Sequence, residues 1–360
     1  MSRKEKACRK QKANGFSLLE LLVAVAILVI VAGAVMAGMI NTTRSQSTVM
    51  NRTQLHASVR NATELMEQEI GQAGRITSAP GLQISAVAAV GSATVTMSAS
   101  SGTPTSEMYI GEQLIVDPST VNEETVAVSA VPSGTSITAT FANTHAANTP
   151  VLVLGGFASG IVPPDTSSML VFSGTGTNNT TLSSGANGQA SSGSVLKLYG
   201  DINGDGTMYY VVYKCSPNSS GTGTLYRYVS TDIMTASAVG TGVLLLDNLA
   251  TNPADSNGNV TPCFTYQTKD TAVTINGGQV IETFVVNVAV TLTIQTQNRD
   301  AKTNQFQTET KALLNISPRN VFDAWELASA PSGYTRAQPM PANVLNGSGG
   351  GSLLTATLTP

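Results

Sequence analysis

Three oxygen-bearing side chains alternate within residues 201–206, whose sequence is DINGDG. Asp201, Asn203 and Asp205 occupy every second position and a glycine follows, which matches the first half of a calcium-binding loop. The closing bidentate acid would fall at Val212, inside a strand pattern. A hairpin turn is the second interpretation, because Asn-Gly and Asp-Gly pairs tolerate positive φ. Both interpretations stay open, and calcium is the single cofactor that the residues suggest.

Residue types used in catalysis are scarce. The chain has two histidines, His56 and His145, on segments that we assign to different structural units. We interpret His56 as a half-buried helix residue. We interpret His145 as a turn residue without a Cys, His or acidic partner at metal-ligand spacing. No G-x-S-x-G, phosphate-loop or dinucleotide signature occurs, so we expect no catalytic residue and no enzymatic activity.

Glu20 is a single acid within a long apolar segment. Residues 1–15 form a basic leader, and residues 16–40 are predominantly apolar. At about 1.5 Å per residue, this segment is long enough to cross a hydrocarbon core of about 30 Å. A charge inside such a span costs roughly 2.5–3.5 kcal/mol, so we expect Glu20 to be functional. Because the positive charge precedes the span, the sequence predicts a single-pass inner-membrane protein with a cytoplasmic N-terminus and an exported C-terminal domain.

The charge distribution also limits the partners. Six basic residues and one acid give the leader a charge of +5, which leaves −8 for the rest of a chain of net charge −3. An acidic exported domain is not expected to bind nucleic acid. An ordinary secretory signal peptide, with small residues at 32–34, is an alternative to the membrane anchor. It leaves Glu20 and the Gly15-Phe16 pair unexplained.

The cysteines differ in their expected surroundings. Cys8 lies in the leader, whereas Cys215 and Cys263 form an even pair in the exported segment. Oxidising conditions there favour a Cys215–Cys263 disulfide over two free buried thiols. Closing a loop of about 50 residues would stabilise the fold by about 4 kcal/mol in the chain-entropy treatment.

The hexapeptide from Gly15 to Glu20, GFSLLE, resembles the cleavage and methylation site of type IV prepilins and type II secretion pseudopilins. The resemblance implies that prepilin peptidase cuts between Gly15 and Phe16 and that the Phe16 amine is N-methylated. It also implies that other pilins or pseudopilins are partners, in a filament or tip complex at the cell surface. Glu20 lies one helical turn from Phe16. We expect it to neutralise the amine of a neighbouring subunit and to set the axial register of assembly.

Three further segments resemble the W-type minor pilins, and two of them also the J-type pseudopilins. QAG at 72–74 is similar to the end of the W-type helical spine. TLYR at 224–227, following a strand with Tyr213, and SPRNV at 317–321 are similar to both types. This resemblance implies an N-terminal helical spine carrying a β headgroup.

Residues 41–74 predict an amphipathic continuation of the helix, which Gly71 and Gly74 end. Its apolar stripe, expected to pack on a sheet, consists of Leu55, Val59, Ala62, Met66 and Ile70. We expect the charged side chains to be solvated, namely those of Arg52, Arg60, Glu64, Glu67 and Glu69.

Alternating apolar runs bounded by Gly, Pro and Ser predict two β-rich units. Residues 80–156 predict an inserted module of five strands, with runs at 93–97, 113–116, 125–128, 136–140 and 151–154. Residues 160–321 predict a headgroup that begins with a polar loop, Ser173–Ser194, expected to be mobile. Its strands are expected at 195–199, 208–214, 225–229, 243–246, 264–268, 273–275, 284–295 and 308–316. Residues 322–360 predict a short helix at 322–328 and then a flexible tail.

The sequence thus predicts an α+β fold, in which a long N-terminal helix packs on a β-rich headgroup with an inserted all-β module. The function we expect is that of a minor pilin, a structural or assembly-initiating subunit of a type IV pilus. A type II secretion pseudopilin is the alternative within the same class. A surface adhesin is the alternative from another class, with the module or the polar loop as its binding surface.

Overall fold

The fold is described from a computed structural model, which covers residues 17–153, 155–164, 170–172, 179–181, 190–231, 239–275, 278–330, 337–341, 344, 353 and 358. The chain divides into two compact units. The first comprises Met1–Gln54 and Asn298–Gln307, and the second comprises Leu55–Gln297 and Thr308–Pro360. A long N-terminal helix followed by a β-rich body confirms the predicted α+β class.

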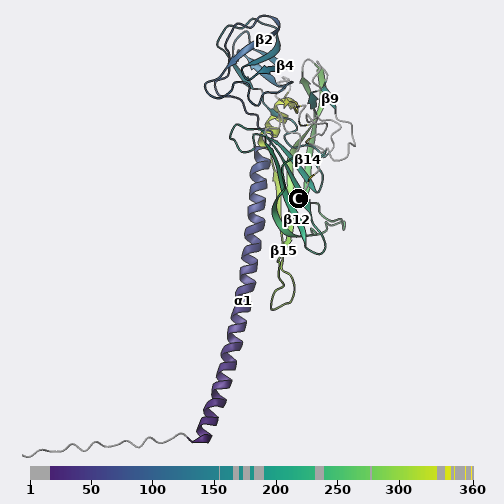
Figure 1. Cartoon of the computed structure of the whole chain (residues 1–360). Helices are drawn as coiled ribbons and strands as arrows, with labels where there is room; N and C mark the ends of the chain where they lie inside the picture. Colours follow the sequence, from purple (N-terminus) through teal and green to yellow (C-terminus); the bar gives the residue numbers. More distant parts are fainter. Residues whose placement is uncertain are drawn as a thin grey trace, which may run out of the picture. The chain divides into compact units, whose positions relative to one another are not determined.

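The first unit contains most of helix α1 (Leu18–Gln72) and the loop Asn298–Gln307 beside it (Figure 1). Every side chain from Leu18 to Ile40 is exposed. Among the described helices, α1 alone is long and apolar enough to cross a membrane. The hydroxyl of Thr48 donates a hydrogen bond of 2.8 Å to the carboxylate of Asp300, which attaches the loop to the helix.

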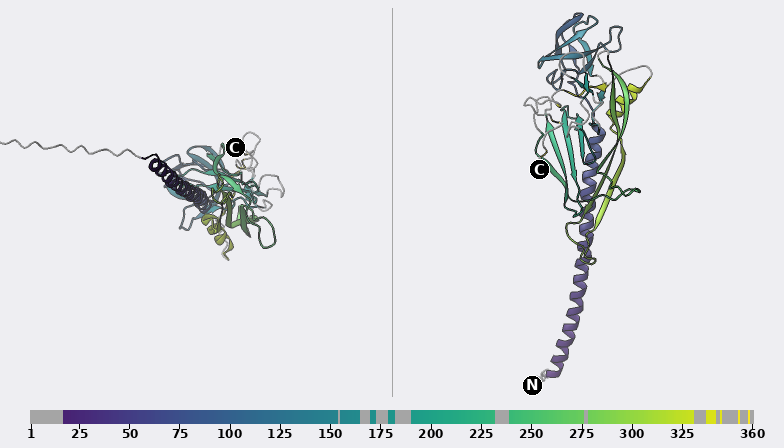
Figure 2. Two further views of the ribbon diagram at one scale, coloured as in Figure 1. Left: turned by 90° about the horizontal axis from the view of Figure 1, so that it is seen from below. Right: turned by 90° about the vertical axis from the view of Figure 1, so that its right-hand side faces the viewer.

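In the second unit, the C-terminal part of α1 packs on a curved sheet (Figure 2). All five residues of the predicted apolar stripe are buried there. The helix ends at Gln72, and Gly74 follows with φ of 82°. A Cβ at Gly74 would lie 2.7 Å from Val321 Cγ2, so both conformation and space require glycine at this position.

The sheet has seven strands in the order β10-β11-β12-β13-β15-β14, and β16 also pairs with β15. The ladders are antiparallel throughout. One strand replaces the two expected at 264–268 and 273–275, because β14 pairs continuously with β15 apart from a bulge after Gln267. The strand bounds are β10 Val195–Gly200, β11 Tyr209–Ser216, β12 Gly223–Thr231, β13 Val243–Ala250, β14 Phe264–Ile275, β15 Gly278–Gln295 and β16 Thr308–Ile316.

The sheet face that points away from α1 has two coverings. Helix α2 (Arg319–Ser329) packs over β14 and β15, and it begins three residues before the predicted 322–328. Residues of the C-terminal tail cover an aromatic cluster that includes Tyr199, Tyr210 and Tyr228. The tail residues in this cover are Met340, Val344 and Leu353. The expectation of a flexible tail is wrong for these three residues, because their apolar side chains are buried.

The inserted module is a closed barrel, with strand order β1-β2-β5-β4-β3-β6. It has six strands, not the expected five, because the two-residue strand β1 pairs with both β2 and β6 and closes it. A separate apolar core fills the interior. The strand bounds are β1 Gln83–Ile84, β2 Gly91–Ser98, β3 Gln113–Val116, β4 Glu124–Ser133, β5 Ser136–Phe141 and β6 Thr149–Val153.

Two short ladders complete the body. Strand β17 (Ala337–Gln338) pairs in parallel with β7 (Gly156–Phe157). Strand β8 (Leu170–Phe172) pairs with β9 (Asn179–Thr181). Most of the expected polar loop Ser173–Ser194 lies outside the described residues, and Ser191 near its end is buried.

Candidate functional site

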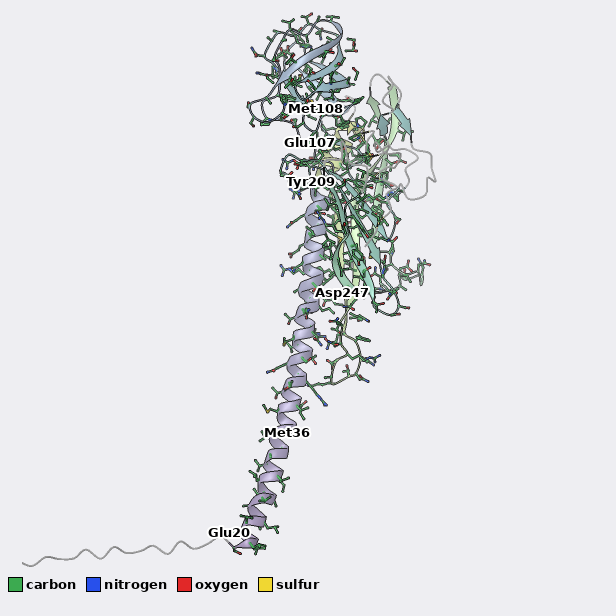
Figure 3. All side chains as sticks on the ribbon, in the orientation of Figure 1. Glu20, Met36, Glu107, Met108, Tyr209 and Asp247 are labelled. Atoms are coloured by element: carbon green, nitrogen blue, oxygen red, sulfur yellow. A yellow bond between two sulfur atoms is a disulfide. The ribbon has the colours of Figure 1, made fainter. Side chains whose placement is uncertain are left out.

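The predicted processing site lies at the edge of the described chain. Gly15 and Phe16 are outside the described residues, which begin at Ser17. The Ser17 carbonyl accepts the N–H of Glu20 at 3.0 Å, so Glu20 lies in the first turn of α1. Its side chain is exposed among apolar side chains, and Figure 3 labels Glu20 and Met36 on this apolar part of α1. No ion pair to Glu20 occurs among residues 17–330 that the structure describes.

A second carboxylate on α1, that of Glu69, is buried against the sheet. Its Oε2 accepts the Tyr213 hydroxyl at 2.5 Å and Arg227 Nε at 3.2 Å, and its Oε1 pairs with Arg227 Nη2. Tyr213 and Arg227 are cross-strand partners on β11 and β12. The expectation that Glu69 is solvated is therefore wrong, whereas Arg52, Arg60, Glu64 and Glu67 are exposed as predicted. Glu69 follows Met66 by three residues, which was the available sequence signal for its burial.

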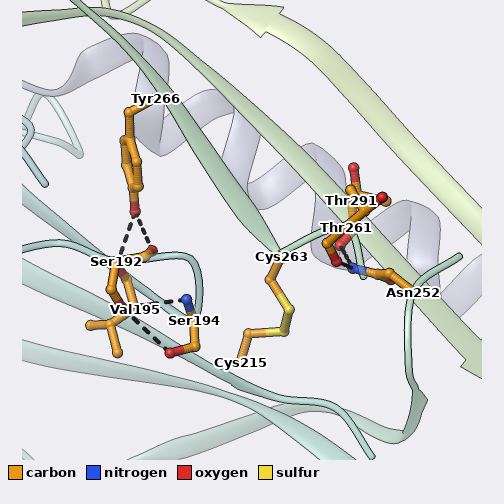
Figure 4. Close-up of a disulfide and its surroundings, with 9 residues drawn as sticks. All are labelled: Ser192, Ser194, Val195, Cys215, Asn252, Thr261, Cys263, Tyr266 and Thr291. Atoms are coloured by element: carbon orange, nitrogen blue, oxygen red, sulfur yellow. Dashed lines mark hydrogen bonds between the residues drawn. A yellow bond between two sulfur atoms is a disulfide. The ribbon is translucent and has the colours of Figure 1, made fainter. Parts of the chain in front are cut away.

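The expected disulfide is present between Cys215 and Cys263, with a Cα–Cα distance of 6.5 Å (Figure 4). Cys215 is on β11, near one edge of the sheet, and Cys263 immediately precedes β14 at the other. The Tyr266 hydroxyl lies 3.0 and 2.9 Å from the carbonyl oxygens of Ser192 and Val195, and so connects the same two edges. These contacts hold the sheet curved around the apolar stripe of α1.

In the acidic turn between β10 and β11, both carboxylates have partners within the protein. Asp201 is buried, and its Oδ2 lies 3.6 Å from Nε of Arg75. Asp205 accepts the N–H of Thr207 at 2.9 Å and the Tyr209 hydroxyl at 2.6 Å, and the bond from Tyr209 is the main cause that lowers the pKa of Asp205. Asn203 is exposed. This arrangement favours the hairpin interpretation, with Gly204 and Gly206 at positive φ, and calcium binding stays an untested alternative.

No group of three or more His, Cys, Asp and Glu residues suited to a metal ion occurs in the part of the chain that the structure describes. His145 nevertheless has acidic partners, contrary to expectation. Its Nε2 lies 2.5 Å from Glu124 Oε1, and its Nδ1 lies 3.8 Å from Asp117 Oδ2. Burial alone would raise the pKa of Glu124, but hydrogen bonds from His145 and two backbone N–H groups outweigh it and lower the pKa. His145 is thus a buried residue of the barrel core. Its partner, 21 residues away, could not be identified from local spacing.

Glu112 is another buried acid, and it lies where the barrel meets the body. Burial raises the pKa of Glu112 to about 8, against the opposing effect of a 3.4 Å hydrogen bond from the Tyr109 N–H. Nearby, the side chain of Gln338 accepts the N–H of Gln113 and donates to its carbonyl, at 2.8 and 2.7 Å. The Tyr109 hydroxyl donates to the carbonyl of Pro339 at 3.0 Å. The C-terminal tail therefore fastens the barrel to the headgroup.

Comparison with known proteins gives one match. Residues 10–36 match the family model of the prokaryotic N-terminal methylation motif. No curated protein and no solved structure is detectably similar to the chain. The matched segment spans the Gly15-Phe16 pair, Glu20 and most of the apolar stretch of α1. The chain therefore carries, at residues 10–36, the N-terminal methylation motif that is the prepilin signal of type IV pilins and pseudopilins.

Proposed function

We propose that the protein is a minor, assembly-initiating subunit of a type IV pilus, with a structural rather than a catalytic role. The methylation motif is the observation that carries the proposal, because it implies processing by prepilin peptidase and assembly with other pilins in a membrane-associated system. The exposed apolar surface of α1 from Leu18 to Ile40 supports it further. Such a surface is stable only in lipid or against other apolar helices.

An initiating position is supported by the way the barrel covers the C-terminal end of α1. The Gly74 carbonyl accepts the N–H of Phe157 at 2.9 Å, and the ring of Phe157 lies 5.9 Å from that of Tyr109 at the base of the barrel. In the body, the barrel thus lies beyond the last turn of α1 (Figure 1). In a pilus whose subunits point their N-termini toward the cell, this is the direction of the tip. A bulky module there suits a subunit with no other subunit above it.

The position in the filament can be tested with an epitope inserted after Val121. This side chain is 99% exposed in the β3–β4 connection, so an insertion there should leave the barrel core intact. Immunogold labelling of sheared filaments should place gold at filament ends. Gold distributed along the shafts would contradict the initiating role, and a secretion defect without loss of pili would favour a pseudopilin.

The role of Glu20 can be tested separately from processing. Glu20→Ala should leave cleavage before Phe16 and N-methylation intact, as measured by mass spectrometry of the mature N-terminus. It should abolish incorporation into filaments, because the amine of a neighbouring subunit would lose its partner. Glu67→Ala makes the same substitution at an exposed position of the same helix and should assemble normally. Normal incorporation of the Glu20 variant would refute the proposed role.

A further inference from the structure

The loop Asn298–Gln307 is ordered around a single carboxylate, that of Asp300. Asp300 Oδ1 accepts the N–H groups of Lys302 and Thr303 at 2.7 and 3.0 Å. Its Oδ2 accepts the Gln307 side-chain amide at 2.7 Å and the Thr48 hydroxyl at 2.8 Å. Both oxygens are therefore occupied and the side chain is buried. These hydrogen bonds fix the shape of the loop and its position along the axis of α1.

The height of the loop follows from the rise of the helix. Thr48 lies eight residues beyond Ile40, where the apolar segment ends, and Arg44 lies four residues beyond it. At about 1.5 Å per residue, these positions are about 12 and 6 Å outside the hydrocarbon core. The polar headgroup layer occupies roughly 5–8 Å on each side of that core. Arg and Lys side chains, which extend their charged ends toward an interface, reach the headgroups from these positions.

The charge and chemistry of this surface suit a lipid interface. Arg44, Arg299 and Lys302 are exposed, and none of them has an ion-pair partner in the described residues. The guanidinium of Arg299 lies 4.8 Å from the ring centre of Phe306, which is 38% exposed. Asp300 is the one acid of the loop, and its carboxylate is used internally. The surface therefore presents three cations and an aromatic ring, without a competing exposed acid.

We infer that Arg44 and the loop Asn298–Gln307 form a membrane contact, which binds anionic lipid headgroups on the side of the membrane to which the body is exported. The inference rests on the proposed function, because it requires residues 16–40 to be anchored in the bilayer. Each cation close to an anionic membrane strengthens binding by roughly a factor of five. Phe306 adds an apolar ring of the kind that interfacial segments bury at the boundary between headgroups and acyl chains.

The contact can be measured by placing an indole in the loop. Phe306→Trp in a Trp325→Phe background gives the full chain one indole, at the proposed contact, since Trp325 is its single tryptophan. The protein is reconstituted into vesicles of brominated phosphatidylcholine, with and without phosphatidylglycerol. The bromines should quench the indole strongly only when phosphatidylglycerol is present. Raising the salt from about 0.1 to about 1 M, which shortens the Debye length from about 10 to about 3 Å, should relieve the quenching.

Charge variants show whether the loop itself causes the binding. Arg299→Gln combined with Lys302→Gln should weaken the lipid contact about 25-fold and reduce quenching to the level in neutral vesicles. Lys269→Gln, which removes one exposed cation from β14, is the matched control and should have no effect. An unquenched indole, or equal quenching with and without phosphatidylglycerol, would overturn the inference.

Two further measurements keep the test decisive. Integration of each variant is measured first by its resistance to alkaline extraction. Failure of the wild-type chain to integrate would contradict the proposed anchoring, whereas an integrated but unquenched chain contradicts the lipid contact alone. Should the indole variant not fold, acetylation of the wild-type protein gives the same information. Lys302, but not Lys269, should react several-fold more slowly in anionic than in neutral vesicles, and equal rates for Lys302 in both would overturn the inference.

Discussion

Replacing Arg227 with methionine would leave the carboxylate of Glu69 buried without its cation. The side chain of Glu69 is 5% exposed and that of Arg227 is 20% exposed, so solvent screens the pair weakly. Removing one member of a buried ion pair costs about 3–5 kcal/mol. The Tyr213 hydroxyl would still donate to Glu69, which places the expected loss for Arg227→Met near the lower limit, at about 3 kcal/mol.

Two companion variants separate the charge effect from packing. Tyr213→Phe removes one hydrogen bond to a charged group, and because Arg227 Nε still bonds the same oxygen, we expect a loss of about 1.5 kcal/mol. Glu69→Leu combined with Arg227→Met and Tyr213→Phe removes both charges and the hydroxyl that would lose its acceptor, and should restore stability to within about 1 kcal/mol of wild type. Arg60→Met, at an exposed pair with Glu64, is the control and should leave the unfolding free energy unchanged.

Urea unfolding of the full chain in detergent, followed by the fluorescence of Trp325, measures these differences. The indole packs against Phe322 on α2, with ring centroids 5.3 Å apart, and therefore reports on the body. A loss below about 1 kcal/mol for Arg227→Met would refute the reasoning. A triple variant as unstable as Arg227→Met would refute it as well, because the cost would then come from packing and not from an isolated charge.

Three further outcomes are expected. Reduction of the disulfide, or Cys215→Ser with Cys263→Ser, should lower the unfolding free energy by about 4 kcal/mol, because the closed loop spans a separation of 48 residues; an unchanged urea midpoint would contradict this. The folded-state pKa of Glu112 is raised to about 8, so the stability that it contributes is complete below its ordinary pKa and is lost as pH rises toward 8. The loss of unfolding free energy between pH 5 and pH 8 should be larger in wild type than in Glu112→Gln, by up to about 4 kcal/mol. Equal losses in the two proteins would exclude this role for Glu112. Calcium should leave the melting temperature unchanged, because Asp201 faces Arg75 and Asp205 is engaged by Tyr209; a calcium-dependent rise that Asp205→Asn abolishes would restore the metal interpretation.

The spacing of apolar residues predicted the helices and strands in which the same spacing repeats over many positions. The helical stripe from Leu55 to Ile70 repeats every three or four positions, and each member is buried. Strand β16 begins and ends at the predicted residues, Thr308 and Ile316, because its pattern has clear boundaries. The disulfide was predicted from the even number of cysteines beyond the leader and from the export expected for that segment, since two cysteines there have few alternatives.

Features that depend on partners distant in the sequence could not be predicted. Strand β1 has two residues, too few for any periodic pattern, and closes the barrel only because β2 and β6 flank it. Gln338 lies in a segment whose composition indicates flexibility, yet its side chain bonds Gln113, 225 residues earlier. The partners of Glu69 lie 144 and 158 residues away on neighbouring strands. Local composition carries no information about such contacts.

The acids of α1 differ in whether they have a partner within the described chain. Glu69 is neutralised by Arg227, and Glu64 pairs with Arg60 one helical turn away, so both are satisfied within the chain. Glu20 lies among exposed apolar side chains, and no partner for it occurs in the described residues. In the proposed membrane anchor, lipid would supply neither a cation nor water to the carboxylate of Glu20, and an isolated charge there would be costly. We therefore propose that the partner of Glu20 comes from outside the described chain, and that it is the amine that cleavage before Phe16 would create on a neighbouring copy.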